Sequence, residues 1–156
     1  MRWWLLAAGI ASILVTEGAG ADPEEFYGVR WGASVDEARK SFRTAGVPPR
    51  EAFCYSQVCL WDRAIGSTPI RLVYEFSNSR FVRGVVQFAP ADYAAVRQMF
   101  IDLYGSPTNR AAERSTWNGD RVRIELSNGA AQGRGTVSRS PGAIQGLSVP
   151  THSPGR

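Results

Sequence analysis

Two cysteines and one histidine are the residues that most directly limit the chemistry of this 156-residue chain. Cys54 and Cys59 are separated by four residues, so they do not form the C-x-x-C motif of thioredoxin-like proteins. The single histidine, His152, lies in a C-terminal segment rich in Ser, Pro and Gly. Because a zinc site needs about four such ligands, these residues cannot build one alone. We therefore expect no metal site and no cofactor.

Catalysis by a nucleophile is not favoured either. A catalytic Ser, Cys or Thr needs a base within reach, and His152 lies outside the segment expected to fold. The sequence has no G-x-S-x-G, S-x-x-K or G-x-x-x-x-G-K motif. Paired carboxylates remain conceivable, since four acidic residues in the expected domain could converge: Asp62, Glu75, Asp102 and Glu125. With the usual catalytic residues missing, we predict that the protein is not an enzyme.

The first 21 residues have the pattern of a Sec-type signal peptide. Arg2 is followed by an apolar run over residues 3–15 and by the small-x-small cleavage site Ala19-Gly20-Ala21. A transmembrane anchor is the alternative, but the run is shorter than the roughly 20 residues that span a bilayer. We predict cleavage after Ala21 and a periplasmic or secreted protein that does not span the membrane afterwards.

Export bears on the two cysteines, because disulfides persist outside the cytosol. If residues 55–58 form a hairpin loop, Cys54 and Cys59 face each other at a distance that a disulfide accepts. A redox-active pair is the alternative, but no thioredoxin-like βαβ pattern surrounds it. We predict a structural disulfide that fixes one turn.

The formal charge of +4 and the sequence pI near 9.5 would suit a nucleic-acid partner. However, the basic residues are scattered rather than clustered, and all but Lys40 are arginines. Since exported proteins rarely meet nucleic acid, we expect none as a partner and relate the charge to solubility or to anionic envelope surfaces.

Two helices are predicted. Ser34 and Glu37 match the capping box, so a first helix begins there and ends at Ala45-Gly46. A second helix follows Asp92 and ends at Gly105. Its apolar residues fall on one stripe that we assign to the core: Tyr93, Val96, Phe100 and Leu103.

Strands fill most of the remaining sequence, as periods of two and β-branched or aromatic residues indicate. We predict a turn at Asn118-Gly119, which would pair Trp117 with Asp120 and place Trp117, Val122, Ile124 and Leu126 on one core face. Gly133 and Gly135 weaken the last strand. The predicted strands cover residues 52–55, 58–64, 70–76, 81–88, 114–117, 120–126 and 135–139.

These elements predict an α+β fold, with an antiparallel sheet of about six or seven strands and two helices on one face. The order is α-β-β-β-β-α-β-β-(β), and residues 34–88 and 92–139 look like two degenerate tandem units. The predicted domain spans residues 22–139. Residues 140–156 have the composition of a disordered tail.

Short motifs carry a resemblance to known proteins. Phe26-Tyr27-Gly28 and Trp31-Gly32-Ala33-Ser34 before the first helix, with Tyr104-Gly105-Ser106-Pro107 after the second, resemble segments of many small exported bacterial proteins of unknown function. The layout is also similar to the β-lactamase-inhibitor-protein-like fold and, more distantly, to the SmpA/OmlA lipoproteins. The chain lacks the lipidation cysteine of the latter family, and the resemblance assigns no functional residue.

Aromatic residues are the first candidates for function. The leading hypothesis is a binding module whose sheet presents aromatic side chains to a protein partner in the cell envelope or outside the cell, because aromatics with Arg are typical interface anchors. The alternative for each is a place in the core. We assign partner binding to Trp31, Trp61 and Tyr74, with Tyr55 and Trp117 as further candidates.

Arginines give a second hypothesis. Arg121 and Arg123 alternate with the core residues of their predicted strand, so they would share the solvent face, and Arg114 would join them from the neighbouring strand. Arg134 and Arg139 could add to the group. Such a patch could bind anionic lipid or lipopolysaccharide phosphate, and the alternative is an ordinary solvated face.

Overall fold

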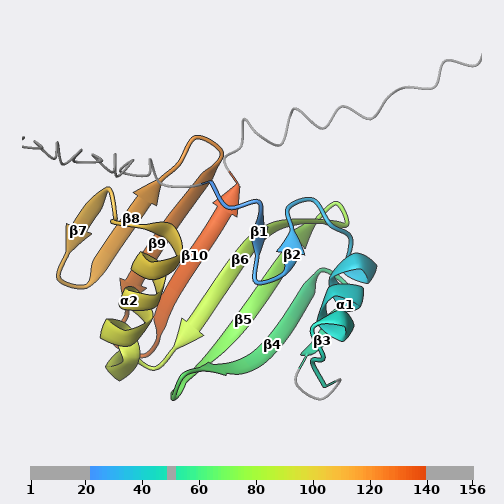
Figure 1. The fold of residues 1–156 in the computed structure, drawn as a ribbon, viewed down its shortest axis with the longest axis horizontal. Coiled ribbons are helices and arrows are strands. Elements are labelled where there is room, and N and C mark those ends of the chain that lie inside the picture. The colour runs from blue at the N-terminus through green and yellow to red at the C-terminus, as the bar shows by residue number, and fades with distance from the viewer. Residues whose placement is uncertain (1–21, 49–51, 140–156) are drawn as a thin grey trace, which may run out of the picture.

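The computed structural model describes residues 22–48 and 52–139, and it consists of one large sheet, a short ribbon and two helices (Figure 1). The sheet has eight antiparallel strands in the order β3-β4-β5-β6-β10-β9-β8-β7. The elements are β1 (Glu25–Phe26), β2 (Val29–Arg30), α1 (Val35–Thr44), β3 (Ala52–Tyr55), β4 (Val58–Ile65), β5 (Thr68–Ser77), β6 (Arg80–Phe88), a 3-10 turn (Pro90–Asp92), α2 (Tyr93–Tyr104), β7 (Asn109–Ala111), β8 (Arg114–Asn118), β9 (Val122–Asn128) and β10 (Gly133–Arg139).

The predicted α+β class with a mainly antiparallel sheet is confirmed, but the predicted number of strands is wrong. The main sheet has eight strands rather than six or seven, and β1 and β2 form a separate two-stranded ribbon. The strands that the sequence did not predict, β1, β2 and β7, have only two or three residues each. Segments this short cannot show an alternating pattern. The predicted signal peptide and the predicted tail lie outside the described residues.

Two units of the same layout make up the sheet. In each unit a helix is followed by four strands, and each set of four runs in sequence order from one edge of the sheet to its centre. The last strands of the two units, β6 and β10, pair with each other in antiparallel fashion. The predicted tandem blocks therefore correspond to two halves that meet at the β6–β10 pair.

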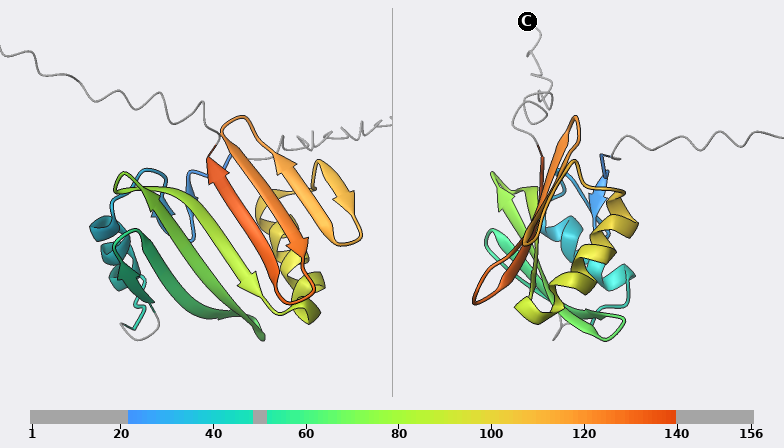
Figure 2. Two further views of the ribbon diagram at one scale, coloured as in Figure 1. Left: turned by 180° about the vertical axis from the view of Figure 1, so that it is seen from behind. Right: turned by 90° about the vertical axis from the view of Figure 1, so that its left-hand side faces the viewer.

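Both helices and the β1–β2 ribbon lie on one face of the sheet, and the ribbon lies between the helices (Figures 1 and 2). Phe26 of the ribbon packs on Gly84 of β6, where an added Cβ would overlap its ring. Phe100 of α2 covers Gly135 of β10 in the same way. The glycines that weakened the predicted last strand thus make room for the aromatic core.

The ends of the helices follow the sequence signals. In α1 the Ser34 side chain accepts from the Glu37 N–H at 3.2 Å, and the Glu37 carboxylate accepts from the Ser34 N–H at 2.7 Å, which confirms the capping box. Gly105 ends α2 with a φ of 79°. Leu103 was wrongly assigned to the core, since 53% of it is exposed.

The β8–β9 hairpin forms with a different register from the predicted one. Trp117 pairs with Ile124 rather than Asp120, and the turn residues are Asp120 and Arg121. Because the register differs by an even number of residues, the predicted core face is kept. Trp117, Val122, Ile124 and Leu126 are all buried.

Candidate functional site: the open face of the sheet

No described element covers the face of the sheet opposite the helices, which we call the open face (Figure 2). Because side chains alternate along each strand, every second residue points to this face. Cross-strand pairing places a row of such residues across the sheet from β3 to β8: Phe53, Leu60, Val73, Val85, Thr136, Glu125 and Thr116. The row is apolar in the first unit and polar in the second.

An exposed aromatic pair marks the apolar end of the open face. Phe53 is 41% exposed and Tyr55 is 66% exposed, and their rings meet edge to face with centroids 5.5 Å apart. Both belong to β3, an edge strand. Val73 and Val85 further along the row are already buried. The apolar surface that a partner can contact is therefore concentrated on β3 and β4.

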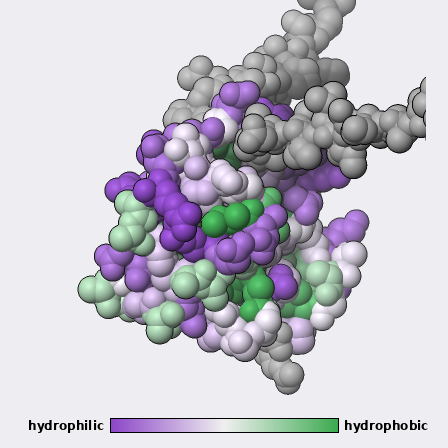
Figure 3. Space-filling view, turned by 60° about the vertical axis from the view of Figure 1, so that its left-hand side comes forward, coloured by the Kyte–Doolittle hydropathy of each residue, from purple (hydrophilic) through white to green (hydrophobic). Residues whose placement is uncertain are grey.

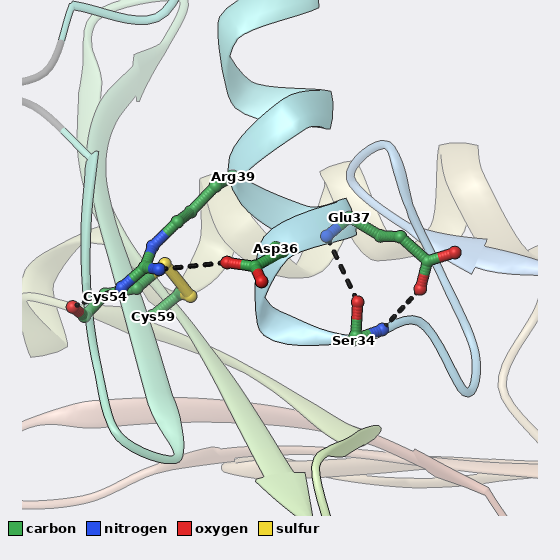
Figure 4. The surroundings of a disulfide bond; sticks show 6 residues. All are labelled: Ser34, Asp36, Glu37, Arg39, Cys54 and Cys59. Atoms are coloured by element: carbon green, nitrogen blue, oxygen red, sulfur yellow. Dashed lines mark hydrogen bonds and ion pairs between the residues drawn. A yellow bond between two sulfur atoms is a disulfide. The ribbon is translucent and has the colours of Figure 1, made fainter.

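The β3–β4 hairpin that carries this aromatic pair is fixed from the opposite face. Cys54 and Cys59 form the predicted disulfide. They are direct cross-strand partners, and their Cα atoms are 4.0 Å apart. Arg39 of α1 donates to Asp36 at 3.0 Å and to the carbonyl oxygen of Cys54 at 3.4 Å (Figure 4). The first helix thus holds the edge strand, and the open face of that strand is presented in one orientation.

Charged residues flank the row on both sides. Arg71 donates two hydrogen bonds to Asp62 at 2.6 and 2.9 Å, and this pairing holds the pKa of the Asp62 carboxyl below its usual value. Glu75 pairs with Arg83 and Arg134, and Glu125 pairs with Arg114 and Arg123. Among the described residues, the open face therefore carries five arginines against three carboxylates, and the charge of these residues is net positive.

The three aromatic residues assigned to partner binding lie away from this face. Tyr74 is completely buried, so its assignment as an exposed anchor is wrong. Trp31 stacks on Phe81 with ring centroids 4.7 Å apart and donates to the Pro23 carbonyl at 2.6 Å. Trp61 packs against the core on the helix-covered side. Of the further candidates, Trp117 is buried and only Tyr55 reaches the open face.

Phe53 is the residue that the sequence reasoning missed. The predicted Cys54–Cys59 pairing places Phe53 and Tyr55 on the face opposite the cysteines, but it does not show which of the two faces is covered. The burial of Cys59 identifies its face as the helix-covered one and places Phe53 and Tyr55 on the open face.

The arginines of the second hypothesis are only partly brought together. Arg114 and Arg123 line a shallow hollow of about 390 Å³ that Arg110 of β7 also lines. Arg121 is separate, because it lies in the β8–β9 turn beside Asp22, at 3.6 Å. Arg139 is the cross-strand partner of Val122, so it lies on the helix-covered face. Arg134 lies on the open face.

The described carboxylates of the open face lie apart from one another. Glu75 of β5 and Glu125 of β9 lie three strands apart, about 14 Å at the usual strand spacing. Each of them, like Asp62, contacts arginine instead. Asp102 lies on α2, across the sheet. Within residues 22–48 and 52–139, no group of three or more His, Cys, Asp or Glu is placed to hold a metal ion.

No family model, curated protein or solved structure matches this chain. Among the described residues, no helix has the length and apolar character needed to cross a membrane.

Proposed function

We propose that the protein is an exported, non-enzymatic binding module whose open face docks a protein partner with an acidic surface. The observation that carries the proposal is the exposed Phe53–Tyr55 pair at one end of a sheet face that no described element covers. Aromatic residues and arginine are both enriched at interfaces, and the open face carries both, with the aromatic pair on β3 and the arginines on the strands further in. Cys54–Cys59 supports a place of action outside the cytosol, because such bonds persist there.

Charge complementarity selects the kind of partner. Because arginines outnumber carboxylates on the open face, an acidic surface is attracted and a basic one is repelled. The apolar contact at β3 and β4 would supply the affinity, and the arginines would supply orientation and rate of association. Raising the salt concentration should therefore slow association more than it speeds dissociation.

Site-specific crosslinking tests this proposal. A photo-crosslinking residue is placed at position 55 and, as the control, at position 43 on the exposed side of α1, and each protein is incubated with envelope extract. A partner captured from position 55 alone is then purified, and its affinity is measured by calorimetry. The double variant Phe53→Ser, Tyr55→Ser should lose at least about tenfold in affinity, as interface anchors do. Equal capture from both positions, or binding that the double variant leaves unchanged, would contradict the proposal.

Anionic lipid is the second candidate ligand, and the hollow lined by Arg110, Arg114 and Arg123 favours it. Arginine forks suit phosphate groups. However, Glu125 already occupies two of these arginines, so lipid phosphate must compete with it. Sedimentation with vesicles containing phosphatidylglycerol should be lost in the Arg114→Glu, Arg123→Glu variant, and unchanged sedimentation would remove the patch as the cause.

A further inference from the structure

A shallow cleft of about 580 Å³ lies on the helix-covered side of the molecule, between α2 and the turn that joins β4 to β5. Its volume is within the range of about 300–1,000 Å³ that small-molecule sites occupy. Most of its lining is apolar, from Tyr27, Ile65, Met99 and Leu103. The cleft is on the opposite side of the sheet from the open face, so it is independent of the site proposed above.

Leu103 is the exposed apolar residue of this cleft. It follows Val96 and Phe100 on α2, yet it stays 53% exposed, because Tyr104, the next residue, is the one that packs against Phe100 and the core. On this side of the molecule, seen toward the β7 edge, hydrophobic side chains reach the surface between hydrophilic ones (Figure 3). An apolar ligand would cover surface here that the fold itself leaves in water.

Arg63 supplies a positive charge to the same cleft. Its guanidinium carbon lies 4.9 Å from the ring centroid of Trp61 and 5.6 Å from that of Tyr27, so two aromatic rings hold it in place. No described carboxylate lies within 4 Å of it, and no described residue accepts a hydrogen bond from it, unlike Arg71, which is paired with Asp62. Arg63 is half-buried, so part of it reaches solvent, and within the described part of the chain no group competes with a ligand for its N–H groups.

The acidic residue of the cleft lies on the other wall. Asp102 of α2 accepts from the Gln98 side chain at 2.9 Å, and it does not pair with Arg63. The sheet side of the cleft is thus cationic and the helix side is anionic. A ligand with a negative group would bind at Arg63 and extend its apolar part over Met99 and Leu103.

We propose that this cleft binds a small alkyl carboxylate. The carboxylate would accept two parallel hydrogen bonds from the Arg63 guanidinium, whose planar fork matches it. The alkyl chain would lie against Ile65, Met99 and Leu103. The aromatic rings beside Arg63 keep the guanidinium in position before the ligand arrives, which lowers the entropy lost on binding.

Three probes with the same chain and different head groups test the proposal by calorimetry, below the concentration at which each forms micelles. Decanoate should bind, decanol should bind at least about tenfold more weakly because it lacks the charge-assisted hydrogen bonds, and decyltrimethylammonium should bind most weakly. Binding of decanol equal to that of decanoate would overturn the proposal. So would tighter binding of the ammonium, which would assign the site to Asp102 instead.

Variants locate the binding. Arg63→Gln should lose the preference for decanoate over decanol, Arg63→Lys should keep part of it, and Leu103→Ser should weaken decanoate and decanol equally. Arg43→Gln, an exposed arginine of α1, is the charge-matched control. Leu103 is already exposed, so its variant tests the cleft even if Arg63→Gln unfolds. Tyr55→Ser on the open face should bind decanoate like the original protein, which separates this outcome from that of the proposed function. Decanoate binding unchanged in Arg63→Gln would overturn the proposal.

Discussion

The carboxylate of Asp22 accepts a hydrogen bond from the backbone N–H of Val122 at 2.9 Å, although the two residues are 100 positions apart. It also accepts from the N–H of Arg121 at 3.0 Å, and only 14% of the Asp22 side chain is exposed. These bonds occupy the backbone donors of the β8–β9 turn. They favour a turn at Asp120-Arg121, whereas local sequence favours Asn118-Gly119.

Replacing Asp22 with alanine should destabilise the protein by about 1.5–3 kcal/mol, because hydrogen bonds to a charged acceptor would be lost and the turn donors left without a partner. Urea unfolding measures the loss. Glu24→Ala, at an exposed position two residues along, is the matched control and should change little. Equal effects of the two variants would show that the Asp22 contacts do not hold the turn.

The disulfide should contribute only modestly to stability. Cys54 and Cys59 close a loop of few residues, so the chain-entropy model gives about 2 kcal/mol. The Cys54→Ser, Cys59→Ser variant should keep the circular dichroism of the original protein and unfold at a lower urea concentration. Cys59 is buried, so part of the effect comes from the new hydroxyl, and chemical reduction of the original protein separates the two. Complete unfolding on reduction would contradict this expectation.

Alkaline pH should unfold the protein through its buried tyrosines. Burial raises the pKa of Tyr27 to about 12, and burial also raises the pKa values of Tyr74 and Tyr104. Since the unfolded chain loses these protons first, near pH 10, stability is complete below that pH and falls as pH rises through the folded values, by at most about 1.4 kcal/mol per pH unit for each tyrosine. Tyr74→Phe should reduce the slope of stability against pH above 10, and an unchanged slope would count against this explanation.

Gly135 should be intolerant of a side chain. A Cβ there would lie 2.5 Å from the Phe100 ring, so Gly135→Ala should cost about 1–3 kcal/mol through overpacking. Thr136→Val, the next residue on the open face, is the control and should be close to neutral. Thermal unfolding of both variants makes the comparison. A similar melting temperature for Gly135→Ala and the original protein would mean that α2 can move away from the sheet.

Sequence was most informative where the signal is local. The capping box at Ser34 and Glu37 and the stop at Gly105 both depend on neighbouring residues, and both are present. The β8–β9 register depends on hydrogen bonds to Asp22, which lies about 100 residues away in the sequence. The residues around the turn therefore could not predict this register.

The candidate site was harder to predict, because residue type does not distinguish an interface aromatic from a core aromatic. Tyr74 and Tyr55 belong to neighbouring hairpins, yet one is completely buried and the other is 66% exposed. The face of the sheet decides between them, and the sequence does not show which face the helices cover. Val73 and Val85 are apolar and buried although they lie on the open face. The central strands therefore do not show the alternation of apolar and polar residues that would have distinguished the two faces.

The two outermost strands of the sheet, β3 and β7, are also its shortest, with four and three residues. Each offers few unpaired backbone groups, and on β3 the Cys54 carbonyl already accepts from Arg39. A strand of another molecule can therefore form few hydrogen bonds with either edge. Short edge strands are one of the ways in which natural proteins avoid aggregation through their sheets. Because the two units meet at the sheet centre, their shortest strands become its edges. This arrangement disfavours polymerisation of the protein by edge-to-edge strand pairing.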